Sequence, residues 1–453
     1  MSKRFSSVIA LLFVAVFAHA QSRIEYHFPM DGSRYVPATS QIILRVSEPI
    51  DLEPADVTVA GDTSGVHAGS LRLSDDGRTY LFTPSESFAP GEAVHVSVAE
   101  QNPAVITPLF FSFQVQTDEQ PNVPFLEPVP SPSLSSAAKS SSSKEDHIES
   151  VPDDFPVLTV GTNNNPAPGD IFLTSYKFDA TGGAYRIVVD SLANPLYYAK
   201  PSKFTDWDFK PTGDGRYSFL EGGYSNAYLM AAGSKCYIMD SSLSVVDNFN
   251  ATTSSTPYTT DFHDFELLPH NHALMLALAT VPHVDMSQYV KGGNKNATIL
   301  GAVIEELDSL KNPIWIWRSW DSGHYLDTDA TNDPFTEDTI DAVHANAMQV
   351  DTDGNILLSA RSMDEITKIN RMDANGSLMW RFGGKHNQFT FVGDSIHFSH
   401  QHALRRIPNG DLTLFDNGNF HQVNITIING TDTETYFQTF ARACEYRLNM
   451  QTM

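Results

Sequence analysis

The sequence predicts an all-β protein with a small N-terminal sandwich and a larger C-terminal array of repeated sheets. Short apolar runs alternate with polar residues along the whole chain, and turns containing Asn, Gly, Asp or Pro separate them. From about residue 170 onward, a unit of about 50–80 residues recurs, while helical periodicity stays weak. With 453 residues, 41% of them hydrophobic, the chain is long enough to bury both parts.

The net charge argues against two classes of partner. The chain has 29 Lys and Arg residues against 54 Asp and Glu residues, a formal charge of -25. Such a surface repels the phosphates of nucleic acids and anionic lipids, so we expect neither as a partner. Cys236 and Cys444 are too few for a disulfide scaffold, and we expect free thiols.

Residues 1–20 have the features of an export signal. Lys3 and Arg4 precede an apolar stretch from Val8 to Ala18, and Ala18-His19-Ala20 forms a cleavage site. The apolar stretch has about half the length that spans a bilayer, and no other segment is apolar enough to do so. We therefore expect a secreted protein without a membrane span, located in the periplasm, outside the cell or at its surface.

Residues 24–116 are expected to form an immunoglobulin-like β-sandwich. The strands IILRVSEPI, VTVAG, TYLFTP, VHVSVAE and LFFSFQVQT are separated by polar turns. The segment resembles the bacterial Ig-like domains of secreted and surface proteins, which implies a role in spacing or adhesion. Residues 117–155 are rich in Pro and Ser and carry few large apolar side chains, so they are expected to form a flexible linker.

Residues 156–453 are expected to form a β-propeller. A strand, a tight polar turn and a second strand recur in DWDFKPTGDGRYSFL, DFELLPHNHALMLAL, MQVDTDGNILLSAR and LRRIPNGDLTLFDNG. A further pair of strands follows each of the first three, and the last is followed by ACEYRLNMQTM, which gives four strands per unit and about five partial units.

Three histidines occur at similar places in these units. His263 and His402 lie eight residues before the turn of their unit, where Trp207 and Asn346 also fall. His344 lies two residues before Asn346, and strand alternation predicts that both point to one face. The innermost strands of a propeller line its central channel, so we expect these polar side chains to converge at one end of the channel.

Four segments together resemble one known family. In chain order, DFHDFELLP, HANAMQVDTDGNILLSAR, LMWRFGG and FSHQHALRRIPNGDLTLFDNG are similar to the arylsulfotransferases that need no nucleotide sulfate donor, and closer to their divergent members. The resemblance covers about residue 170 to the C-terminus and is densest over 341–418. It implies a six-bladed propeller, which we expect to be incomplete at the C-terminus of this chain.

The resemblance also implies a reaction. A sulfuryl group moves from a phenolic sulfate ester to a phenol through a sulfohistidine, without a metal or organic cofactor. His402 would be the nucleophile, while His263, His344, Asn346 and Arg361 would hold the sulfate and phenolic oxygens. The chemistry is compatible, because neutral imidazole is a nucleophile near neutral pH and cationic donors stabilise charge on the sulfuryl oxygens.

Structural interpretations of the same residues stay open. Asp264 could orient His263 as a core histidine, Arg361 could form an ion pair with an inner-face carboxylate, and Asn346 could bond the backbone. His400 has no role implied by the resemblance. Three histidines could also hold zinc, although no supporting motif is present. A secreted or surface-associated propeller that binds without turnover is the alternative function.

Overall fold

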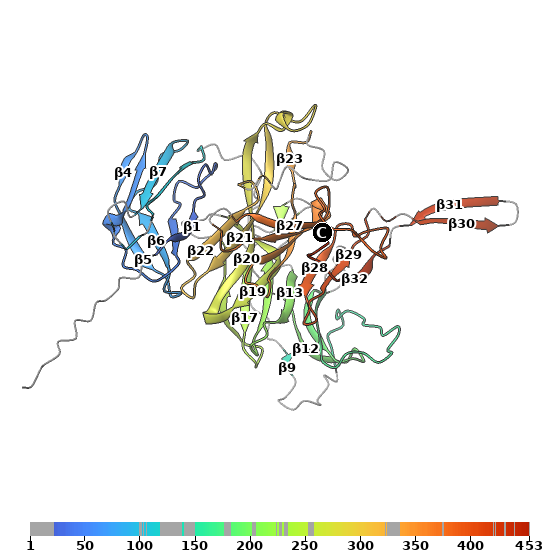
Figure 1. The fold of residues 1–453 in the computed structure, drawn as a ribbon. Helices are drawn as coiled ribbons and strands as arrows, with labels where there is room; N and C mark the ends of the chain where they lie inside the picture. Colours follow the sequence, from blue (N-terminus) through green and yellow to red (C-terminus); the bar gives the residue numbers. More distant parts are fainter. Residues whose placement is uncertain are drawn as a thin grey trace, which may run out of the picture.

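The computed structural model describes residues 22–98, 102, 104–105, 107–117, 138–139, 150–175, 183–201, 205–222, 224–225, 229–230, 234–251, 258–321, 323, 336–373, 376–419, 421, 423–429, 432–438 and 440–452. The expected signal and most of the expected linker lie outside them. The described chain is all-β with almost entirely antiparallel sheets, which confirms the predicted all-β class (Figure 1). No helix in this part of the chain has the length and apolar character to cross a membrane. Cys236 and Cys444 are free thiols.

The N-terminal part consists of two four-stranded sheets around one core. The first sheet has the order β1 (Ile24–Phe28), β2 (Ile42–Val46), β6 (Thr79–Pro84) and β5 (Gly69–Leu73). The second has the order β4 (Gly65–His67), β3 (Val57–Gly61), β7 (Ala93–Val98) and β8 (Leu109–Gln114), with the turn η1 (Pro54–Asp56) before β3. Apolar residues of both sheets share a core that includes Leu44, Val59, Phe82, Val96 and Phe113. Alternate side chains therefore meet between the sheets, as in a sandwich.

The C-terminal part begins with two further antiparallel sheets. The first contains β10 (Ile171–Ser175), β11 (Tyr185–Val189) and β12 (Pro195–Ala199), with β9 (Ala138–Lys139) paired to β12. The second contains β13 (Thr205–Pro211), β14 (Tyr217–Gly222), β17 (Lys235–Met239) and β18 (Val245–Phe249), and a separate hairpin joins β15 (Tyr224–Ser225) to β16 (Leu229–Met230).

Three more sheets complete the described chain. The third contains β19 (Thr259–Leu268), β20 (His272–Val284), β21 (Ala297–Leu307) and β22 (Pro313–Arg318), with β23 (Thr339–Ile340) parallel to β21; the turns η2 (Pro269–Asn271) and η3 (Met286–Gln288) flank β20. The fourth contains β24 (Ala345–Val350), β25 (Ile356–Ala360), β26 (Glu365–Ile369) and β27 (Leu378–Gly383), with η5 (Arg361–Met363) between β25 and β26. The fifth contains β28 (His402–Arg406), β29 (Leu412–Asp416) and β32 (Arg442–Tyr446), and the hairpin of β30 (Val423–Asn429) and β31 (Asp432–Gln438) projects from it (Figure 1).

The first strands of successive sheets contact one another. β10 contacts β13, β13 contacts β19, β19 contacts β24, and β24 contacts β28. This arrangement brings side chains from sheets far apart in the sequence to a common region. Packing on the first sheet starts before residue 156, because Asp154 accepts hydrogen bonds from Tyr185 Oη (2.5 Å) and Lys200 Nζ (2.7 Å), and Phe155 packs edge-on against Tyr185 and Tyr198.

One buried carboxylate connects four of these first strands. Asp264 of β19 accepts hydrogen bonds from Lys210 of β13, from both terminal nitrogens of Arg405 of β28 (2.9 Å each), and from the Met348 N–H of β24 (2.8 Å). Burial alone raises the pKa of the Asp264 carboxyl, but the two cations hold it below its usual value. Removing one member of a buried charge network leaves the others uncompensated, so this network stabilises the spacing of the first strands.

The N-terminal sandwich packs against the third sheet, as Figure 1 shows for β1 and β22. The Tyr26 hydroxyl donates to the Ile316 carbonyl (2.9 Å) and accepts from the Ile316 N–H (2.8 Å). Tyr26 and Phe28 belong to the same apolar cluster as Trp315 and Trp317. The contact thus combines apolar burial with hydrogen bonds to the backbone of β22, whose far edge has no partner strand in the described sheet.

Ion pairs and hydrogen bonds surround this contact. Arg72 pairs with Asp308 at 2.8 Å, and His272 lies 2.9 Å from Asp75. Arg318 donates to the backbone carbonyl of Arg34 at 3.2 Å. A sandwich held by a buried face and several charged contacts is a packed part of the protein.

Candidate active site

Three histidine rings from three different sheets lie together. His263 belongs to β19, His344 directly precedes β24, and His402 is the first residue of β28. The ring centroid of His263 is 5.3 Å from that of His344 and 5.9 Å from that of His402. The side chains of His263 and His344 remain 13% and 14% exposed, so the cluster is accessible to solvent. The first strands of successive sheets contact one another, and these contacts bring together histidines that are distant in sequence.

Each strand that carries a site residue is irregular at that position. The pairing register shifts around His263 in β19, at Asn346 in β24 and directly after His402 in β28. The register of β13 likewise shifts after Trp207. A bulge bends its strand and changes the direction of the side chains, which is why bulges are frequent at active sites.

Asn346 is bound to the backbone of the neighbouring sheet. Its Nδ2 donates to the carbonyl of Gln401 at 2.7 Å, and the residue is only 3% exposed. Its Oδ1 is buried without a hydrogen-bond partner among the described residues. The bulge at this position breaks the alternation that would place Asn346 on the face of His344. The amide fixes the segment before His402, and a free acceptor remains beside it.

The His402 ring has a defined protonation pattern. Its Nδ1 lies 3.0 Å from the His400 carbonyl oxygen and 2.9 Å from Asn417 Oδ1. Because a carbonyl only accepts, Nδ1 carries the proton and Nε2 carries the lone pair. Burial, the nearby His263 and the more distant His344 lower the pKa of His402 to about 4. His402 is therefore a neutral imidazole at neutral pH, with a nucleophilic Nε2.

The His263 ring has the opposite electrostatic environment. Its Nδ1 lies 2.7 Å from Asp261 Oδ1, which also accepts the His263 backbone N–H at 2.8 Å. Burial on its own lowers the pKa of His263, but the Asp261 carboxylate outweighs it and raises that pKa above its ordinary value. The side chain that orients His263 is thus Asp261, whereas Asp264, the partner considered from the sequence, bonds Lys210 and Arg405.

The carboxylate that His344 bonds also acts electrostatically on Arg361. His344 Nδ1 bonds Asp341 Oδ2, and the backbone N–H of Arg361 donates to the His344 carbonyl at 3.1 Å. Burial raises the pKa of the Asp341 carboxyl. The adjacent His344, together with Arg361 and His263, outweighs burial and holds that pKa below its usual value. Burial lowers the pKa of the Arg361 guanidinium, although Asp341 and Asp364 oppose this. Asp341 therefore connects His344, Arg361 and His263 electrostatically.

A stack of aromatic rings extends from the histidines. The Phe262 ring lies parallel to the His263 ring, with centroids 4.4 Å apart, and to the Trp207 ring at 4.5 Å. Trp207 is partly exposed on β13, so the stack forms an apolar flank beside the polar cluster.

Asp261, Asp341 and Asn417 contact the histidines of the site but were not predicted from the sequence. A signal for two of them was present, since an aspartate precedes His263 by two residues and His344 by three. Asn417 lies in the FDNG segment and approaches His402 only through the pairing of β28 with β29. His400 is buried, bonds Asp364 through its backbone N–H (2.6 Å) and offers its carbonyl to His402, which is a structural contribution. In the described residues, no group of three or more His, Cys, Asp or Glu side chains is placed to hold a metal ion.

Comparison with protein families matches residues 157–453 to the family described as arylsulfotransferase (ASST). The chain belongs to the arylsulfotransferase family. The matched region contains the three clustered histidines together with Asn346 and Arg361, while the N-terminal sandwich lies outside it. The arylsulfotransferase resemblance stated from the sequence motifs is thereby confirmed.

Similar solved structures resemble the chain only weakly. An L,D-transpeptidase from Mycobacterium smegmatis is 20% identical, with a TM-score of 0.17 over 21% of this chain and 41% of that one. A structural genomics protein of unknown function from Bacteroides thetaiotaomicron is 10% identical, with a TM-score of 0.25 over 88% and 82% of the two chains. At these TM-scores neither likeness carries an argument. No curated protein matches the chain.

Proposed function

We propose that this protein is an exported arylsulfotransferase that moves a sulfuryl group from a phenolic sulfate ester to a phenol through a sulfohistidine on His402. The observation that carries the proposal is the protonation pattern of the cluster. His402 is held neutral with its Nε2 lone pair free, beside His263, whose pKa is raised. A nucleophile and a proton donor with opposite pKa shifts in one cluster are typical of acid–base and nucleophilic catalysis.

The reaction follows in two balanced steps. In the first step, His402 Nε2 attacks the sulfur of the ester, the N–S bond forms, and the bond from sulfur to the phenolic oxygen breaks. The leaving phenolate takes a proton from His263, and the first phenol departs. In the second step, the acceptor phenol returns a proton to that histidine, its oxygen attacks the sulfur, and the N–S bond breaks. His402 is then neutral again.

The charges of the site support this chemistry. The three sulfuryl oxygens gain negative charge during transfer, and Arg361 with the protonated form of His263 provides positive charge for them. Asp261 and Asp341 hold the imidazoles through Nδ1, which leaves the Nε2 atoms of His263 and His344 for the substrate. The Trp207–Phe262 stack supplies an apolar surface for a phenyl ring beside this anion site.

The architecture fits the same proposal. Sheets whose first strands contact in sequence, from β10 to β28, support a propeller of the six-bladed type. The strand orders β1-β2-β6-β5 and β4-β3-β7-β8 match the ABED and C′CFG arrangement, which supports an Ig-like sandwich. Export, with removal of residues 1–20, remains part of the proposal.

The test uses the full chain with 4-nitrophenyl sulfate as donor and phenol as acceptor. We expect release of nitrophenolate, its loss in His402→Ala, and a labile SO3 adduct on the peptide that contains His402. His95→Ala, which changes an exposed histidine of the sandwich, is the matched control and should retain activity. If the wild-type chain releases no nitrophenolate and carries no adduct, the enzyme proposal fails, and a binding propeller without turnover becomes the better explanation.

A further inference from the structure

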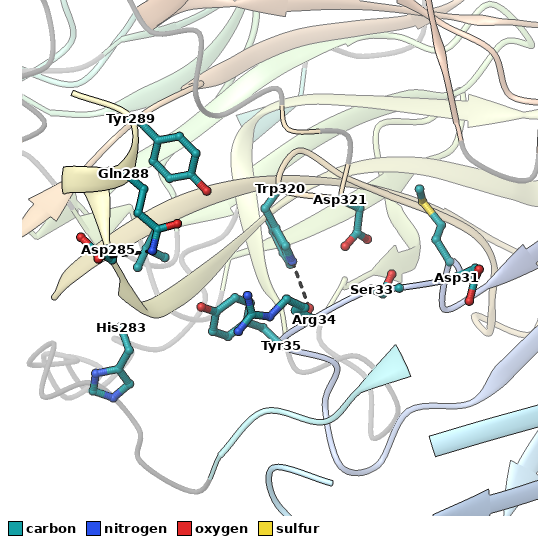
Figure 2. A pocket seen from close by; sticks show the side chains of 13 residues that line it. Asp31, Ser33, Arg34, Tyr35, His283, Asp285, Gln288, Tyr289, Trp320 and Asp321 are labelled. Atoms are coloured by element: carbon teal, nitrogen blue, oxygen red, sulfur yellow. Dashed lines mark hydrogen bonds between the residues drawn. The ribbon is translucent and has the colours of Figure 1, made fainter. Parts of the chain in front are cut away.

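A separate cavity of about 260 Å³ lies between the N-terminal sandwich and the third sheet (Figure 2). The segment 30–35, between β1 and β2, forms one wall. The segment 283–289, at the end of β20 and through η3, forms the other, and Trp320 and Asp321 complete the lining after β22. The cavity therefore exists only while the two parts of the chain are packed together.

Aromatic rings from both parts line this cavity. Tyr35 comes from the sandwich, while Tyr289 and Trp320 come from the third sheet, and Figure 2 shows Trp320 between the side chains of the two walls. Trp320 is held in place, since its Nε1 donates to the Arg34 carbonyl (3.4 Å) and a Cβ at Gly301 would lie 2.4 Å from its ring. Tyr289 is 47% exposed and presents its ring to incoming molecules.

Polar groups of the lining have unused bonding capacity. Ser33 is 4% exposed, and its Oγ is buried without a hydrogen-bond partner among the described residues. The Arg34 guanidinium lies 5.7 Å from the centroid of the Tyr35 ring and is exposed. An unpaired buried hydroxyl is unfavourable unless a water or a ligand bonds it, so Ser33 is a binding group without an internal role.

The backbone of one wall is strained. Tyr35 has φ 56°, in the left-handed region that residues with large side chains rarely adopt. Such conformations persist where the surrounding structure enforces them, and they cluster at binding and catalytic sites. The conformation of Tyr35 therefore indicates that the sandwich wall of the cavity is under constraint.

The lining carries more negative than positive charge, since Asp31, Asp285 and Asp321 face Arg34. Asp321 is paired with Arg318 at 2.6 and 2.8 Å, and Asp285 accepts a hydrogen bond from the Ser287 N–H of its own turn. The lining therefore disfavours an anion, whereas a neutral ligand with apolar faces and many hydroxyl groups fits both the rings and the unused polar groups.

We propose that this cavity binds one neutral sugar ring. Its volume is below the about 300–1,000 Å³ of pockets for drug-sized ligands, which suits a single pyranose ring. The C–H face of the sugar packs on Tyr289 and Trp320, and its hydroxyls bond Ser33, Arg34 and Gln288. The sandwich wall of this site lies outside residues 157–453, the region matched to the arylsulfotransferases. The site therefore gives the protein a means of attachment to glycans that is independent of sulfuryl transfer.

The experiment measures binding of methyl α-glucopyranoside and methyl N-acetyl-glucosaminide to the full chain by ligand-observed NMR. Choline serves as a cationic probe. We expect at least one glycoside to bind and its affinity to fall about fivefold to tenfold in Tyr289→Ala, which removes one stacking ring. Ser33→Ala should weaken binding by a smaller factor. Phe110→Ala, which removes an aromatic side chain that is 62% exposed on β8, is the matched control and should bind as the wild type does.

Two outcomes overturn the proposal. Binding of neither glycoside, or glycoside binding that Tyr289→Ala leaves unchanged, means that the cavity is not a sugar site. Binding of choline alone, lost in Tyr289→Ala, assigns the cavity to a cationic ligand instead. Because nitrophenolate release is measured separately, failure here leaves the proposed transfer reaction untouched.

Discussion

Replacing Tyr26 by Phe tests how firmly the N-terminal sandwich is packed on the third sheet. The substitution removes only one hydroxyl, so the ring of a residue that is 1% exposed keeps its place against Trp315. That hydroxyl is hydrogen-bonded to both the carbonyl and the N–H of Ile316, at 2.9 and 2.8 Å. In Tyr26→Phe both backbone groups of a buried strand residue lose their partner.

The expected cost follows from these two groups. Each buried polar group left without a partner costs about 1–3 kcal/mol, so Tyr26→Phe should lower the free energy of unfolding by about 2–6 kcal/mol. This is a large part of the about 5–15 kcal/mol that stabilises a typical protein. The loss of stability should affect the contact between the sandwich and the third sheet first, because both hydrogen bonds of the Tyr26 hydroxyl lie there.

Urea denaturation followed by tryptophan fluorescence measures this loss, since Trp315 and Trp317 share the apolar cluster of the contact. Tyr289→Phe, which removes a hydroxyl from a half-exposed ring, serves as control and should change stability by less than about 0.5 kcal/mol. A change of the same small size in Tyr26→Phe would refute the reasoning, because it would mean that water satisfies the edge of β22 and the sandwich is not packed there.

Three further predictions concern the candidate active site. Asp261→Asn keeps an oxygen that can accept a hydrogen bond from His263 but removes the charge that raises the pKa of His263. Because His263 must be protonated to act as the acid, the alkaline limb of the pH–rate profile should move to lower pH. The acid limb should lie near pH 4, since His402 stays neutral down to its lowered pKa, and a limb near pH 6.5 would contradict its assignment as nucleophile. Asp264→Asn weakens the charged hydrogen bonds from Lys210 and Arg405, whose side chains are 25% and 34% exposed, and thermal unfolding should show a loss of about 1–3 kcal/mol.

The sequence predicted the all-β class and the three histidines because both depend on local patterns. Alternation and turn residues indicate strands directly, and a register counted from the turns selects the residues near the start of each first strand. The same counting could not orient Asn346, because a bulge inserts an irregularity that alternation does not contain. It also could not find Asn417, whose approach to His402 depends on strand pairing.

The packing of the sandwich on the third sheet was not predicted, although one signal was present. The strand Ile42–Val46 is buried at every residue, and its sequence IILRV is apolar at four of five positions. A strand exposed to water on one face alternates in polarity, whereas one covered on both faces is apolar throughout. The run therefore indicated a second covering layer, but it could not identify which part of the chain supplied it.

The conformation of the backbone beside the site restricts which sequences can occupy it. His344 has φ 49° and His400 has φ 55°. Histidine, asparagine and aspartate tolerate this region better than most side chains, whereas valine, isoleucine and threonine do so poorly. A mutant library aimed at new acceptor phenols should therefore leave positions 344 and 400 to histidine, asparagine, aspartate or glycine, and place its diversity on the aromatic flank at positions 207 and 262.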